Sequence, residues 1–100
     1  MGLFSNLFGK STDFSAMVKE GAMIVDVRTT GEFAGGHIKG SKNIPLQDLS
    51  NHLKNLPKDK VIITCCASGM RSASAKNILK NNGYNQVYNG GGWMQLKGKI

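Results

Sequence analysis

The chain has 100 residues, 40% of them hydrophobic, so it is long enough for one compact domain and too short for two. It has no apolar run of membrane-spanning length and no secretory signal at its N-terminus, so we predict a cytoplasmic domain whose two cysteines are thiols. The net charge is +7, and residues 60–100 contain six lysines and arginines but no acid. Such a basic half could attract nucleic acid, anionic lipid or a small anion, or simply form a solvated surface; nucleic acid is disfavoured because no interleaved aromatic residues accompany the lysines.

The first 45 residues predict an arm, two helices and two strands. Residues 1–11 are expected to form an N-terminal arm, and residues 12–100 a single domain. Thr12 or Asp13 is a suitable N-cap for a helix that ends near Glu20, before Gly21. The apolar, β-branched residues 22–27 predict a buried parallel strand, residues 31–34 a short helix, and residues 42–45 a short strand that ends at Pro45.

The second half of the chain repeats this alternation. Leucines at positions 46, 49, 53 and 56 predict a helix over residues 46–55, and Pro57 ends it. Residues 60–66 predict a second buried strand. Ser72 is a suitable N-cap for a helix from about Ala73 to Gly83. Residues 85–89 predict a last strand, and a glycine turn at 90–92 precedes a helical turn or an extended tail.

Strands that alternate with helices are typical of a parallel α/β sheet, so we predict one central parallel sheet with helices on both faces. In such sheets functional groups gather at the carboxyl ends of the strands. Two candidate sets lie there, namely Asp26 with Arg28, and the segment from Cys65 to Arg71.

The segment after the second strand has the features of an anion-binding loop. Ala67, Ser68 and Gly69 are small, so their backbone N–H groups can turn inward, and a helix begins directly afterwards. A cysteine at such a helix N-terminus has a lowered pKa and is a nucleophilic thiolate. The alternative is that both cysteines are small core residues. We predict no metal site, because adjacent cysteines do not give the usual ligand spacing and the chain has no other cysteine.

Three blocks of the chain, in order, resemble the rhodanese homology domain in its single-domain sulfurtransferase form. They read IVDVRTTGEFAGGHIKGSKNIP (24–45), CASGMRS (66–72) and VYNGGGW (87–93). The second block is similar to the active-site pattern C-x-x-G-x-R-S of that family. The resemblance extends over about residues 12–98, and the first two blocks together are highly specific.

The resemblance implies a role for each residue of the loop. Cys66 aligns with the catalytic cysteine, which takes sulfur from a donor such as thiosulfate and passes it to cyanide or a thiol. The N–H groups from Ala67 to Ser72, which include those of Ser68, Gly69 and Met70, would hold the persulfide. Arg71 would draw in the anionic donor, and no cofactor is implied. Asp26 and Arg28 would anchor the flanking loops, while Glu32 with His37 would close the segment between them. Trp93 and the glycines before it would close the edge of the sheet.

Several alternatives stay open at this point. Related phosphatases place five residues between cysteine and arginine, whereas four separate Cys66 from Arg71, which favours sulfur over a phosphoryl group or arsenate. A non-catalytic rhodanese-like binding module would be expected to lack the nucleophile. A redox sensor would join Cys65 to Cys66, but strand alternation predicts that the two point apart. Met70 would make the rim apolar and favour a thiol or protein acceptor.

Overall fold

The computed structural model describes residues 12–100, and the predicted arm lies outside the described residues. Four parallel strands form one sheet in the order β2-β1-β3-β4. Their bounds are Met23–Asp26 for β1, Lys42–Asn43 for β2, Ile62–Cys66 for β3 and Val87–Gly92 for β4. Because all strands run the same way, the ends of β1, β3 and β4 meet at one edge, with Asp26 paired to Cys65.

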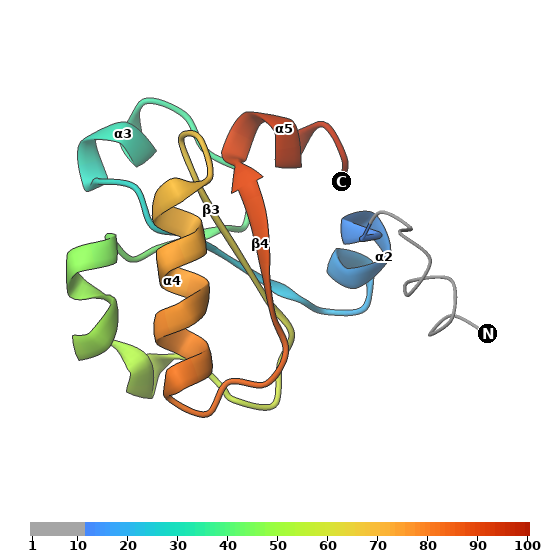
Figure 1. The fold of residues 1–100 in the computed structure, drawn as a ribbon. Coiled ribbons are helices and arrows are strands. Elements are labelled where there is room, and N and C mark those ends of the chain that lie inside the picture. Colours follow the sequence, from blue (N-terminus) through green and yellow to red (C-terminus); the bar gives the residue numbers. More distant parts are fainter. Residues whose placement is uncertain (1–11) are drawn as a thin grey trace.

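Helices cover both faces of the sheet, as the sequence predicts (Figure 1). One face packs against α4 (Met70–Asn81) and two 3₁₀-helices, η1 (Leu46–Asn51) and η2 (Leu53–Asn55). The other face packs against α2 (Phe14–Lys19) and α5 (Trp93–Lys97). In Figure 1 the short helix α3 (Thr30–Ala34), the β3–α4 loop and α5 gather at the carboxyl edge of the sheet. Among the described residues, no helix has the length and apolar character needed to span a bilayer.

The predicted helix over residues 46–55 is wrong, because this stretch forms η1 and η2 with a break at His52. Leu46 and Leu49 are three residues apart, which matches the threefold repeat of a 3₁₀-helix. The polar residues around His52 have low helix propensity. The segment therefore buries Leu49 and Leu56 without forming a continuous α-helix.

Two local expectations near the loop are also corrected. The last major helix begins at Met70 and not at Ala73, and its N-cap is Gly69, not Ser72. Gly69 has a φ of 109°, which turns the chain early and leaves Ser72 to face the cysteine. The glycines at 90–92 continue β4 instead of forming a turn. A Cβ on Gly90 would lie 2.9 Å from the side chains of Ile63 and Leu96, so close packing requires glycine there.

Candidate active site

Cys66 is the last residue of β3 and lies directly below the loop that leads into α4. The two adjacent cysteines lie on opposite faces of the sheet, because side chains alternate along a strand. Cys65 packs in the core with Phe14, Ile63 and Leu96, whereas Cys66 belongs to the core on the α4 side. A disulfide between them would need one sulfur to leave its own core. Both are free thiols in the structure.

The β3–α4 loop directs polar groups at the Cys66 sulfur. The backbone N–H of Gly69 donates to Sγ at 2.9 Å, and the N–H of Ser72 does so at 3.4 Å. The Ser72 hydroxyl lies 3.6 Å from the same sulfur. The thiol is buried, with 1% of its surface exposed, while Ala67 and Ser68 beside it are exposed. This cradle of N–H donors is suited to hold a negative charge on sulfur.

These contacts set the pKa values of the two thiols far apart. Burial raises the pKa of Cys66, but hydrogen bonds from Ser72 and from the backbone N–H groups of Gly69 and Ser68 outweigh it, so the net pKa lies below the ordinary value. Burial, together with the nearby Asp26 carboxylate, raises the pKa of Cys65 to about 12. Of the two thiols, Cys66 is therefore the one that ionises more readily, while Cys65 stays protonated.

The Ser72 hydroxyl also binds Asn89, which comes from β4. It donates to Asn89 Oδ1 at 2.6 Å and lies 3.0 Å from the Gly69 carbonyl oxygen. Asn89 Oδ1 accepts a second hydrogen bond from the N–H of Gly91, at 2.9 Å. Asn89 thus fixes the Ser72 side chain from the neighbouring strand. The sequence interpretation missed this residue, and its pattern carries no signal that would have identified it.

Close approach of β4 to the loop depends on glycine. A Cβ on Gly92 would lie 2.8 Å from the carbonyl oxygen of Ala67, and a Cβ on Gly69 would lie 3.5 Å from Cα of Gly91. The glycine-rich end of β4 therefore packs against the back of the sulfur cradle. From the sequence these glycines are expected only to close the edge of the sheet, whereas in the structure they also pack against the loop that surrounds Cys66.

Arg71 is held by an ion pair with Glu32 from α3. The two guanidinium nitrogens Nη1 and Nη2 donate to Oε1 and Oε2 at 2.8 and 3.1 Å. Hydrogen bonding to Arg71, and then to Thr29, lowers the pKa of Glu32 to about 2. At the other end of this segment, His37 Nδ1 bonds the Phe33 carbonyl oxygen and its ring stacks on that of Phe33.

Asp26 and Arg28 form a buried ion pair beneath these loops. Arg28 Nη2 lies 2.7 Å from Asp26 Oδ2, and Nε also donates to the carboxylate. The same guanidinium donates to the carbonyl oxygens of Glu32 and Gly36, and it lies over the ring of Trp93. The pair does not contact Cys66, so its geometry is that of an anchor for α3 and the segment after it. Trp93 contributes to that anchor by packing against Gly36.

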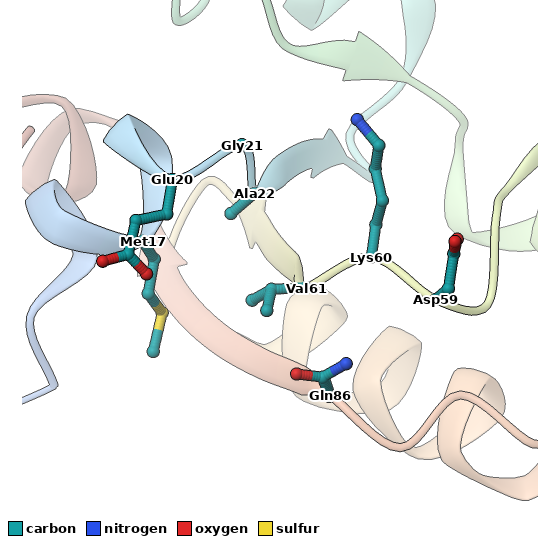
Figure 2. Close-up of a pocket in the computed structure, with 8 residues that line it drawn as sticks. All are labelled: Met17, Glu20, Gly21, Ala22, Asp59, Lys60, Val61 and Gln86. Carbon is teal, nitrogen blue, oxygen red and sulfur yellow. The ribbon is translucent and has the colours of Figure 1, made fainter.

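Two exposed methionines lie at the starts of α4 and α5. Met70, the first residue of α4, is 80% exposed, and Met94 at the start of α5 is 69% exposed. Within residues 12–100 no three His, Cys, Asp or Glu side chains are grouped as metal ligands. One cavity, lined by Glu20, Asp59 and Lys60 among others, lies where β1 and β3 begin (Figure 2). It is at the edge of the sheet opposite to Cys66 and has no contact with the cysteine.

The chain is similar to known proteins along most of its length. The family model of the rhodanese-like domain matches residues 11–99. The thiosulfate sulfurtransferase GlpE of Stutzerimonas stutzeri is 37% identical over 81 residues, which cover 81% of this chain and 74% of that protein. The uncharacterized protein YqhL of Bacillus subtilis is 40% identical over 80 residues, and the match covers 79% of this chain but 64% of YqhL.

Solved structures share the fold. A structure described as rhodanese with anions from E. coli has a TM-score of 0.69 and 31% identity, covering 73% of this chain and 88% of that one. The reduced CoADR-RHD protein of Bacillus anthracis has a TM-score of 0.76 and 39% identity over 87% of this chain, which spans 15% of that longer protein.

Proposed function

The chain belongs to the rhodanese-like domain family, and on that premise we propose that it is a sulfurtransferase that carries a sulfane sulfur as a persulfide on Cys66. The observation that carries this proposal is the set of N–H donors around the Cys66 sulfur, at 2.9 Å from Gly69 and 3.4 Å from Ser72. Such donors stabilise a thiolate before the reaction and a persulfide anion after it.

In the first step the Cys66 thiolate attacks the outer sulfur of a donor such as thiosulfate. A sulfur–sulfur bond forms to Cys66 while the bond to the sulfonate sulfur breaks, and sulfite leaves with that electron pair. The charge on the cysteine side is −1 before and after the step, so the same N–H groups serve both states. Thiolate chemistry of this kind fits a reducing compartment such as the cytoplasm.

In the second step a nucleophilic acceptor takes the outer sulfur. Cyanide would leave as thiocyanate and a thiol as a persulfide, and in both cases the Cys66 thiolate is regenerated with no external oxidant or reductant. The exposed side chains of Met70 and Met94 support an acceptor with apolar surface, such as a thiol on a small molecule or a protein. The four-residue spacing from Cys66 to Arg71 favours this chemistry over phosphoryl transfer.

The test is the intact mass of the protein after incubation with thiosulfate and removal of excess donor. The wild type should gain one sulfur atom, and the adduct should disappear on addition of cyanide with release of thiocyanate. Cys66→Ser should gain nothing. Cys65→Ser is the matched control, since it removes the neighbouring thiol, and it should keep the adduct. A folded wild type that acquires no sulfur from thiosulfate or from an organic persulfide would indicate a non-catalytic binding module instead.

A further inference from the structure

Glu32 is unusually well fixed for a half-exposed carboxylate. It is residue N3 of α3 and forms a capping box with Thr29, in which its N–H donates to Thr29 Oγ1. Its Oε1 accepts from the Thr29 backbone N–H at 2.9 Å and from the Thr29 hydroxyl at 3.1 Å. The carboxylate is therefore oriented by its own helix before it meets any other side chain.

The helix that bears Glu32 is itself anchored to the sheet. Arg28, which is buried against Asp26, donates to the Glu32 carbonyl oxygen at 3.3 Å and to that of Gly36 at 2.7 Å. Exposed ion pairs usually contribute little, because two long side chains must be ordered to form them. Here Glu32 is already ordered by its own helix, so only the Arg71 side chain loses conformational entropy when the bidentate contact forms.

Glu32 also cancels the charge of Arg71. Its low pKa, about 2, keeps the carboxylate ionised at neutral pH. An anion that enters the cradle of Cys66 therefore meets a guanidinium already paired with a carboxylate. The attraction lost in this way is proportional to the charge of the anion, so a doubly charged donor loses about twice as much as a singly charged one.

We propose that Glu32 is a positioning and specificity-determining residue, which holds and neutralises Arg71 and so selects against small dianionic donors in favour of organic persulfides with at most one charge on the transferred sulfur. This inference rests on the proposed function, because donor selectivity presupposes that Cys66 accepts sulfur from a donor. Thiosulfate would then be a competent but weakly bound donor, and the donor preferred by this site would be a persulfide on a thiol compound or a protein.

The substitution Glu32→Gln separates charge from structure. Glutamine also occupies N3 of a capping box, so the hydrogen bonds with Thr29 and the start of α3 are retained. Only the negative charge next to Arg71 is removed. The matched control is Glu20→Gln, which removes one charge from an exposed residue at the opposite edge of the sheet.

The test measures anion binding to the Cys66→Ser protein, in which no sulfur is transferred, by NMR titration at fixed ionic strength. Adding Glu32→Gln should tighten the binding of thiosulfate by about tenfold, and that of singly charged thiocyanate by about threefold, the square root of tenfold. Glu20→Gln should change both by much less. In an Arg71→Ala background the gain from Glu32→Gln should be clearly smaller, because no guanidinium is then released to meet the anion and only the direct repulsion by the Glu32 carboxylate is removed.

The inference is overturned if Glu32→Gln leaves thiosulfate binding unchanged or weakens it. It is also overturned if both anions gain equally, since an effect of charge would be larger for the dianion, or if Glu20→Gln has the same effect, since that would reflect net charge and not the Arg71 pair. Absence of detectable binding in every variant counts against it as well. Because Cys66 is absent from these proteins, a failure of sulfur transfer in the wild type would leave the binding result intact, so the two proposals fail separately.

Discussion

Asp26→Asn should destabilise the domain strongly without removing the chemistry of Cys66. Asp26 is fully buried and accepts hydrogen bonds from the backbone N–H, Nε and Nη2 of Arg28, which is 4% exposed. Asparagine keeps the shape and part of the hydrogen bonding, but it leaves the buried guanidinium without a counter-charge. Breaking a buried pair on one side costs about 3–5 kcal/mol, and the lower end applies here because the amide oxygen still accepts. For 100 residues this corresponds to a fall in Tm of about 15 °C.

The assay is urea unfolding, together with the sulfur adduct measured by intact mass at a temperature where the variant is folded. Asp59→Asn makes the same chemical change at an exposed position and should cost less than about 0.5 kcal/mol. If Asp26→Asn lowered the free energy of unfolding by less than about 1 kcal/mol, the buried Arg28 guanidinium would not need Asp26 as its counter-charge. If the folded variant formed no adduct, Asp26 would act on the reaction, and its role as an anchor would be the wrong assignment.

Three further outcomes are expected. Alkylation of the native protein should modify Cys66 alone near neutral pH, because the pKa of Cys66 is lowered while burial raises that of Cys65 to about 12; a second label in native protein, read by mass, would contradict this. Gly90→Ala should lose about 1–3 kcal/mol in urea unfolding, since its Cβ would lie 2.9 Å from two core side chains and a carbonyl oxygen. Hydrogen bonding to Arg71 lowers the pKa of Glu32 from 4.5 to about 2, so the ionised form stabilises the fold above pH 4.5 and this contribution is lost as the pH falls towards 2. Glu32→Gln should flatten the acid unfolding curve over that window.

Much of the fold follows from the sequence because strong local signals agree with the tertiary arrangement. The runs at residues 22–27 and 60–66 are apolar and β-branched, and both are buried central strands, β1 and β3. Asp13 caps α2 as its position predicts. The failures occur where tertiary packing decides. The leucines at 46–56 contact the core from two 3₁₀-helices. The glycines at 90–92 continue β4: other groups fill the space that a side chain on Gly90 or Gly92 would take, and Gly91 has a φ of 80°.

In the candidate site, too, local features could be predicted from the sequence and long-range contacts could not. The separation of Cys65 from Cys66 and the turn of the loop towards Cys66 could be predicted, because alternation along a strand and the small residues after Cys66 are local properties. The wider environment of Cys66 could not. Asn89 is 17 residues from Ser72 in the chain and reaches it only through the pairing of β3 with β4. The pairing of Arg71 with Glu32 joins residues 39 positions apart. The capping box marks Glu32 as part of a helix start, but nothing in that pattern reveals its second partner.

Residues of the first sequence block that anchor the fold are linked by hydrogen bonds to Arg71 at the start of α4. Asp26 holds Arg28, Arg28 holds the backbone of α3, and α3 presents Glu32 to Arg71. Each link is a charge-assisted hydrogen bond, and the chain of contacts runs from the sheet interior to the rim of the sulfur cradle. A residue that never touches the substrate can therefore set the charge that the substrate meets. Under the proposed function, it follows that substitutions along this chain that displace Glu32 from Arg71 should change donor selectivity even where Cys66 keeps its full reactivity.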